Sequence, residues 1–193
     1  MSRLLLASAS PRRIRLLREA GFNPEVLPSQ IVETQADFLT PAERALFNAI
    51  RKGMVIAVEH PDDIVLSADT IVTLDGSVFG KPADLEEAFR MLKLLVGKTH
   101  EVITAVAVMH LNKERTRVGT ERTAVKFRSL ADSEIREYLE ITGPLDKAGA
   151  YAAQESPDRI IESVTGSFTN VVGLPMELTI PILAEFGIRP EMP

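Results

Sequence analysis

The residues of this sequence that could do chemistry are a carboxylate in an unusual place and a set of cations. Asp69 interrupts the apolar run IVLSADTIVTL at 64–74, where a carboxylate costs free energy unless it is paired or functional. A second carboxylate, Glu33, and five cations accompany it along the chain: Arg12, Arg13, Lys52, Lys81 and Lys147. Such cations can hold a polyphosphate, and the carboxylates can hold a divalent metal. The alternative for Asp69 is a structural carboxylate at a strand end, paired with the backbone or a lysine.

The stretch LLLASASPRR at 4–13 brings polar groups to a turn. Its apolar residues predict a short strand, and Ser10 and Pro11 predict the N-cap and first residue of a helix that ends near Gly21. The free N–H groups and positive dipole end of such a helix bind anions. Arginines at 12, 13, 15 and 18 oppose that dipole, so a bound anion would stabilise the segment. The alternative is an ordinary capped helix with solvated arginines.

Composition limits the class of protein. The 193 residues, 45% hydrophobic and 25% charged, are typical of a soluble chain that folds as one domain over 1–193. No stretch approaches the roughly 20 apolar residues of a membrane span, and the apolar run at 4–7 is too short for a secretory signal. The absence of cysteine excludes disulfides and thiol chemistry and favours a cytoplasmic location.

The charge distribution favours a small anionic ligand over a nucleic acid. A net charge of −5 argues against stable binding of DNA or RNA, which usually needs a basic face. Residues 1–20 nevertheless hold five arginines against Glu19, a local balance of +4. A basic cluster on an acidic protein indicates a compact anion as partner.

Common nucleotide and hydrolase motifs are missing. The GKT at 97–99 lacks the earlier glycine of a P-loop, and no G-x-G-x-x-G occurs. Ser8 and Ser10 belong to no nucleophile-elbow motif. His60, His100 and His110 lack metal-ligand spacing, so we expect them to be structural or solvated.

The hydrophobic pattern alternates between strands and helices. We expect strands at 4–7, 64–74, 101–110, 116–127 and 160–164, and helices at 11–20, 41–52, 85–96, around 135–139 and from 175, where Pro181 should cause a kink. Asp75-Gly76 predicts a hairpin turn. Gly53 is expected to weaken or redirect the helix that begins at 41, and 165–175 is expected to form a loop and strand. The interleaved order predicts an α/β fold with a mixed sheet.

Five motifs occur in the order found in the Maf family of nucleoside triphosphate pyrophosphatases. They are S-x-S-P-R-R at 8–13, SADT at 67–70, GKP at 80–82, DKAGAY at 146–151 with Gln154, and GSFTNVVGLP at 166–175. The sequence therefore resembles this family from residue 4 to about 186. Gly53 after Lys52, and the absence of glycine from AYAAQES at 150–156, depart from the family pattern.

The resemblance implies an elongated α/β fold related to the inosine triphosphate pyrophosphatases, with a mixed sheet flanked by helices and a central cleft. It also implies a divalent metal, Mg²⁺ or Mn²⁺, and a homodimer. Carried over by motif, the residues that bind the triphosphate are Ser8, Ser10, Arg13, Lys52 and Lys81, and those that hold the metal are Glu33 and Asp69. Asp69 would act as the general base, as a metal ligand or as both.

The same resemblance implies hydrolysis of a nucleoside triphosphate between its α and β phosphates. In the family, the positions that match Arg12, Thr70 and Gln154 differ between two kinds of enzyme. Enzymes with Arg, Thr and Gln there act on dTTP and UTP, whereas enzymes that act on 7-methyl-GTP have Trp, Gln and Glu. A glutamine amide both donates and accepts, as the edge of uracil or thymine requires, so we expect dTTP and UTP. The rival hypothesis is a non-catalytic nucleotide-sensing regulator of septum formation.

Overall fold

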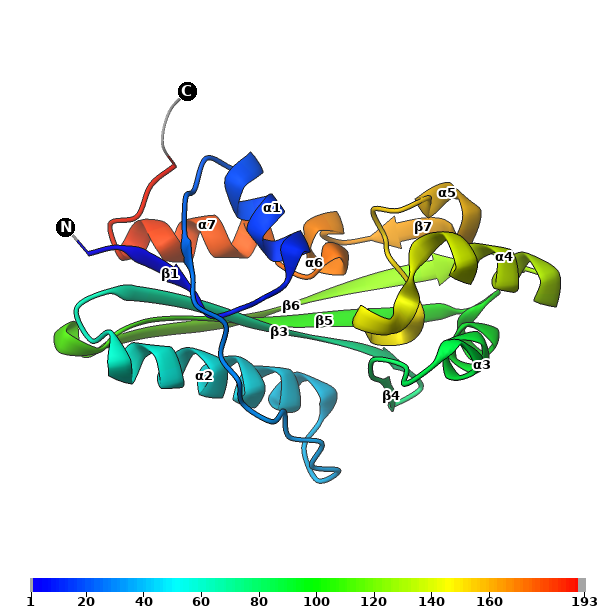
Figure 1. Cartoon of the computed structure of the whole chain (residues 1–193), viewed down its shortest axis with the longest axis horizontal. Helices are drawn as coiled ribbons and strands as arrows, with labels where there is room; N and C mark the ends of the chain where they lie inside the picture. The colour runs from blue at the N-terminus through cyan, green and yellow to red at the C-terminus, as the bar shows by residue number, and fades with distance from the viewer. Residues whose placement is uncertain (1, 191–193) are drawn as a thin grey trace.

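The computed structural model describes residues 2–190, and its centre is a mixed sheet of seven strands. The strands are β1 (Leu4–Leu6), β2 (Glu25–Val26), β3 (Ile64–Leu74), β4 (Ser77–Phe79), β5 (Thr99–His110), β6 (Arg115–Phe127) and β7 (Ile161–Thr165). Their order is β2-β1-β3-β5-β6-β7, with β4 paired to β3. β1 is parallel to β2 and β3, and the remaining pairs are antiparallel. The long strands β3, β5 and β6 give the molecule its elongated shape (Figure 1).

Helices cover both faces of this sheet (Figure 1). They are α1 (Pro11–Glu19), α2 (Pro41–Glu59), α3 (Leu85–Leu95), α4 (Asp132–Thr142), α5 (Pro157–Ile160), α6 (Phe168–Val172) and α7 (Met176–Glu185), with 3-10 turns η1 (Leu111–Lys113), η2 (Pro144–Asp146) and η3 (Ala148–Ala150). At one end of the sheet, α1 and α7 lie on one face and α2 on the other (Figure 1). The predicted mixed sheet flanked by helices is confirmed. No helix within residues 2–190 is long and apolar enough to cross a membrane.

The alternation of side chains along β3 decides which way Asp69 points. Leu66 and Ala68 pack with α1 and α7, whereas Val65 and Ile71 pack with α2. Successive strand residues face opposite sides of a sheet, so Asp69 lies on the same side as Val65 and Ile71. Its carboxylate therefore faces α2.

α2 approaches the sheet closely because a stripe of small residues faces it. The stripe recurs every four residues, at Ala45, Ala49, Gly53 and Ala57, all of them buried. A Cβ atom at Gly53 would lie 2.7 Å from the Oγ of Ser67 on β3. The expectation that Gly53 weakens or redirects the helix is wrong, since α2 continues to Glu59. The glycine is required by the close packing, and tertiary contacts outweigh its low helix propensity.

Three other local predictions have different outcomes. Asp75 and Gly76 both have positive φ, 51° and 81°, so the predicted two-residue hairpin turn between β3 and β4 is confirmed. The loop and strand expected over 165–175 is wrong, because the segment forms the short helix α6, whose N-cap Ser167 accepts a hydrogen bond from the backbone N–H of Asn170. Pro181 lies inside α7, which continues to Glu185, so the proline does not end the helix. The kink expected at Pro181 stays a prediction.

Candidate active site

A cleft of about 860 Å³ opens beside the end of β1, where the turn into α1, the buried face of α2, and β3 meet. An irregular segment between β2 and α2, residues 27–40, lies along its rim and is called the strap below. The hairpin after β3 and the segment 146–154 contribute the remaining wall. All ten site residues predicted from the sequence line this cleft: Ser8, Ser10, Arg12, Arg13, Glu33, Lys52, Asp69, Thr70, Lys81 and Gln154.

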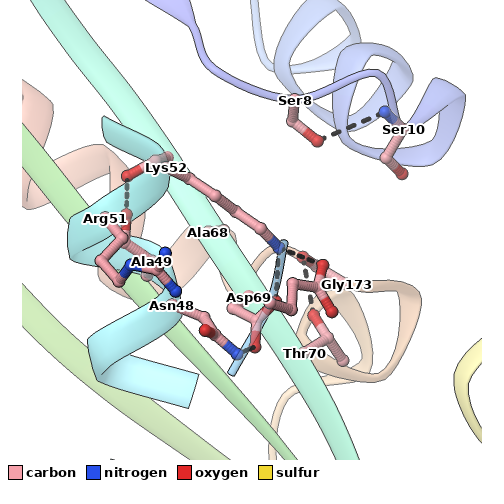
Figure 2. Close-up of polar contacts among 12 residues, drawn as sticks. Ser8, Ser10, Asn48, Ala49, Arg51, Lys52, Ala68, Asp69, Thr70 and Gly173 are labelled. Atoms are coloured by element: carbon pink, nitrogen blue, oxygen red, sulfur yellow. Dashed lines mark hydrogen bonds and ion pairs between the residues drawn. The ribbon is translucent and has the colours of Figure 1, made fainter. Parts of the chain in front are cut away.

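Lys52 joins the two predicted carboxylates. Its Nζ lies 2.5 Å from Oδ1 of Asp69 and 2.6 Å from Oε1 of Glu33. Figure 2 shows the lysine extending from α2 toward Asp69, with Asn48 reaching the same carboxylate from one turn earlier. The amide Nδ2 of Asn48 lies 3.4 Å from Oδ2 of Asp69. Asp69 is therefore paired with a lysine, as the structural alternative required, and it also faces the cleft, as a functional role requires.

The charges of the cleft keep Glu33 ionised. Burial by itself raises the pKa of this carboxyl, but the hydrogen bond and charge of Lys52 oppose that effect. Lys81 and Arg13 add to the positive potential at Glu33. Together the cations outweigh burial and hold the Glu33 pKa below its ordinary value.

Arg13 is buried at the base of the cleft, and the protein uses most of its donors. Its Nε donates to the carbonyl of Gly173 at 2.8 Å, and Nη1 donates to the carbonyl of Ala68 at 2.8 Å and to Ser8 Oγ at 3.1 Å. Its Nη2 donates to Thr70 Oγ1 at 3.1 Å. Burial, the largest influence, lowers the pKa of this guanidinium despite the nearby carboxylates. Arg13 therefore braces the cleft floor and supplies it with positive charge.

The start of α1 faces the cleft with free polar groups. Ser10 occupies the predicted N-cap position, but its side chain makes no capping hydrogen bond. Its backbone N–H donates to Ser8 Oγ at 3.3 Å (Figure 2). Because no side chain caps this end, the first N–H groups of the helix remain available to a ligand.

An ion pair crosses the cleft wall from α1 to η2. Arg12 Nη1 lies 2.8 Å from Oδ2 of Asp146, whose other oxygen accepts from Lys147 Nζ at 2.7 Å. Lys147 is 7% exposed, and its ammonium also donates to the carbonyls of Thr142 and Gly143. Lys147, counted in the sequence among the cations that could hold phosphate, thus binds the C-terminal end of α4 and braces Asp146.

Lys81 and Gln154 lie on the remaining wall of the cleft. Lys81 is exposed, and no carboxylate of residues 2–190 lies within 4.0 Å of its ammonium, so this cation is available to an anion. Gln154 is half-buried, and its side chain makes no hydrogen bond to the described part of the chain. Thr70 differs from both, because its Oγ1 contacts Arg13, Thr104 and the carbonyl of Gly173.

The sequence matches the family model described as Maf-like protein over residues 3–186. The chain belongs to the Maf family. A dTTP/UTP pyrophosphatase of Symbiobacterium thermophilum is 43% identical over 187 residues, which cover 97% of this chain and 95% of that protein. A dTTP/UTP pyrophosphatase of Bacillus pumilus is 43% identical over 190 residues, 98% of this chain and all of that protein. The solved Ham1 protein of Staphylococcus aureus is 12% identical, with a TM-score of 0.45 over 68% of this chain and 73% of that one, too low a likeness to support an argument.

Two polar residues, Asn48 in this Maf cleft and Thr104 buried behind Thr70, were not predicted from the sequence. Asn48 is 2% exposed and bonds both Asp69 and the strap. Its position four residues before Lys52 on the buried face of a predicted helix was the available signal. Thr104 supports Thr70 from β5 at 2.9 Å. It lies in an apolar strand with no motif around it, so only the strand pairing of β3 with β5 reveals it.

Proposed function

We propose that this Maf protein hydrolyses dTTP and UTP to the nucleoside monophosphate and pyrophosphate. The observation that carries the proposal is the alignment of Glu33, Lys52 and Asp69 in a cleft lined by further cations, on a chain 43% identical to proteins named dTTP/UTP pyrophosphatase. Hydrolysis of a phosphoanhydride requires little covalent chemistry from a protein. It requires positioning of the phosphates, neutralisation of their charge and an activated water molecule.

The triphosphate would lie between the start of α1 and Lys81. The uncapped N–H groups of α1 and the hydroxyls of Ser8 and Ser10 offer donors to phosphate oxygens. Lys81 and Lys52 supply ammonium groups, and the buried guanidinium of Arg13 adds positive charge below them. Developing charge on the leaving pyrophosphate would be stabilised by the same groups.

Glu33 and Asp69 suit a hard divalent cation such as Mg²⁺ or Mn²⁺. Each carboxylate has one oxygen paired with Lys52 and another without an ionic partner among the described residues. Residues 2–190 contain no cluster of three or more carboxylate or imidazole groups able to hold a metal by themselves. Two carboxylates completed by water and substrate phosphates are a usual arrangement for Mg²⁺. When bound, the ion would neutralise phosphate charge and polarise the phosphorus that is attacked.

Asp69 would remove a proton from the attacking water. Its Oδ1 is occupied by Lys52, so Oδ2, held only by the long contact from Asn48, is the oxygen that would accept the proton when Glu33 holds the divalent ion. The water oxygen would then form a bond to the α phosphorus while the bond to the bridging oxygen of pyrophosphate breaks. Lys52 would hold the carboxylate in a fixed orientation before the reaction.

Arg12 and Gln154 would recognise the base. The free amide of Gln154 can donate to a carbonyl and accept from an N–H group of uracil or thymine. Arg12 is directed by Asp146 and keeps donors of its guanidinium for the ligand. The hydroxyl of Thr70 is occupied by protein groups, so its role would be to support Arg13 and the Gly173 carbonyl at the floor of the site.

Pyrophosphate release separates this function from the rival one. Purified protein with Mg²⁺ or Mn²⁺ should release pyrophosphate from dTTP and UTP faster than from CTP or 7-methyl-GTP. A protein that binds these nucleotides without releasing pyrophosphate would act as a sensor, the alternative that the names of the relatives do not favour. The homodimer, the cytoplasmic location and the single domain over 1–193 stay predictions.

A further inference from the structure

Side chains from one face of α2 fasten the strap to the body of the protein. The side-chain oxygen of Asn48 accepts from the N–H of Thr34 at 2.9 Å, and its Nδ2 lies 3.4 Å from the carbonyl of the same residue. Arg51 donates to the carbonyl of Val32 at 3.0 Å. Positions 48 and 51 are three apart and so share a helix face. The strap backbone is thus held on both sides of residue 33, the carboxylate that pairs with Lys52.

Asn48 has a second contact that Arg51 lacks. Its Nδ2 also lies 3.4 Å from Oδ2 of Asp69, and Figure 2 shows the amide of Asn48 directed toward that carboxylate. A primary amide has two N–H donors and one oxygen acceptor. One donor serves the strap carbonyl, the other serves Asp69, and the oxygen takes the strap N–H. Asn48 is 2% exposed, so water does not substitute readily for these bonds.

Lys52 alone does not fix the relative position of the two carboxylates. Its ammonium is a compact charge on a flexible stem and accepts partners from many directions. The planar amide of Asn48 is directional, and its orientation is set by two bonds to one backbone unit of the strap. Asn48 also lies on the same helix as Lys52, one turn before it.

We propose that Asn48 is a positioning residue that fixes the position of Glu33 relative to Asp69 in the cleft. It does so by binding the strap backbone next to Glu33 and the carboxylate oxygen of Asp69 that Lys52 leaves free. The proposal rests on the proposed function, since the relative position of the two carboxylates matters only where both act on a triphosphate. Asn48 itself need not touch the substrate.

Two substitutions separate the two contacts of Asn48. Asn48→Asp keeps the size of the side chain and the acceptor for the N–H of Thr34, but replaces Nδ2, which faces both Asp69 and the carbonyl of Thr34, by a carboxylate oxygen. Asn48→Ala removes both contacts. Arg51→Ala is the matched control, because it releases the strap at Val32, which is 84% exposed and open to water, and leaves Asp69 untouched.

Steady-state kinetics with UTP and Mg²⁺ test the contact to Asp69. Both Asn48 variants should lower kcat by about 10- to 100-fold, the order expected for a small displacement of reacting groups. KM for UTP should change by less than about threefold, because the cations that bind phosphate remain. Arg51→Ala should keep kcat within about threefold of the wild type. An Asn48→Asp protein with wild-type kcat, or one whose entire loss lies in KM, overturns the proposal.

Hydrogen exchange at the amide of Thr34 tests the contact to the strap without any activity. The amide should exchange slowly in the wild type and in Asn48→Asp, and at least about tenfold faster in Asn48→Ala, whose acceptor is gone. Unchanged exchange in Asn48→Ala overturns the proposal whether or not the protein hydrolyses nucleotides. A wild type that shows this exchange pattern but releases no pyrophosphate would instead reject the proposed function.

Discussion

Lys52 and Asp69 form an ion pair of 2.5 Å in which the two side chains are only 12% and 6% exposed. Removing one partner of a buried pair usually costs about 3–5 kcal/mol, because the other charge is left uncompensated. Here the ammonium also binds Glu33 at 2.6 Å, so loss of the Asp69 charge still leaves it a partner. Substitution at Asp69 should therefore report on chemistry more than on folding.

Asp69→Asn removes the proposed base and preserves its shape. Loss of a general base typically lowers the rate by about 10²–10⁴-fold, and we expect kcat for UTP to fall by that order. The melting temperature should stay close to that of the wild type, because Glu33 continues to neutralise Lys52. Steady-state kinetics and thermal denaturation of the purified variant measure both. An Asn variant with near wild-type kcat would place the base elsewhere.

Gln154→Glu tests recognition of the base. Glutamate can only accept hydrogen bonds, so one partner of the uracil edge is left unpaired, and an unpaired polar group in a recognition site can cost several kcal/mol. We expect kcat/KM for UTP and dTTP to fall by about 10- to 100-fold, with release of pyrophosphate still detectable. Gln154→Glu is a cleaner test than substitution of Thr70, whose hydroxyl also supports Arg13. Unchanged preference among UTP, dTTP and CTP would argue against the assignment.

Gly53→Ala tests whether helix propensity or close packing determines the stability of α2 at this position. Propensity alone predicts a gain of about 1 kcal/mol in the free energy of unfolding. The added methyl group would lie 2.7 Å from the Oγ of Ser67, which donates to the carbonyl of Ala49. We expect packing to win, with a loss of about 1–3 kcal/mol measured by urea denaturation. Adding Ser67→Ala should recover part of that loss. A more stable single variant would show that α2 moves away from β3 without cost.

His100 links the stability of the fold to pH. Burial lowers its pKa to about 4, and the ring lies against Phe127 with Nε2 3.0 Å from the hydroxyl of Tyr151. The unfolded chain takes up a proton near pH 6.5, so the unfolded state binds more protons than the folded state between that pH and about 4. The free energy of unfolding should therefore fall, by on the order of 3 kcal/mol, as pH drops through this window.

The control for that prediction is His100→Gln, which carries no titrating group and can still pair with Tyr151. Carboxylates elsewhere in the protein also lose stabilising contacts in acid. The quantity to compare is therefore the difference in the free energy of unfolding between wild type and variant at each pH. That difference should change between pH 6.5 and 4 and stay level above pH 7. A constant difference would mean that His100 becomes protonated in the folded state without penalty.

The sequence predicted the strands β1, β3, β5, β6 and β7, most helices and the set of residues around the cleft, because these follow from local pattern and from five ordered motifs. It did not predict β2, which has only two residues. It missed the continuation of α2 through Gly53, since the contact with Ser67 that requires glycine joins segments far apart in the chain. It did not predict helix α6, because a segment of five residues is too short to show the repeat of apolar residues that marks a helix. The use of Arg13 and the Thr70 hydroxyl by protein groups depends on tertiary contacts that no spacing along the chain reveals. Lys147 binds carbonyls only four and five residues earlier in the chain, at the end of a helix whose exact end the sequence did not predict.

Hydrolysis of UTP in water enriched in ¹⁸O tests the central claim most directly. If the cleft directs water to the α phosphorus, the products are UMP carrying one labelled oxygen and pyrophosphate carrying none, both measurable by mass spectrometry. The same experiment with dTTP should give labelled dTMP. Formation of UDP and orthophosphate, or label in pyrophosphate with unlabelled UMP, would contradict the account.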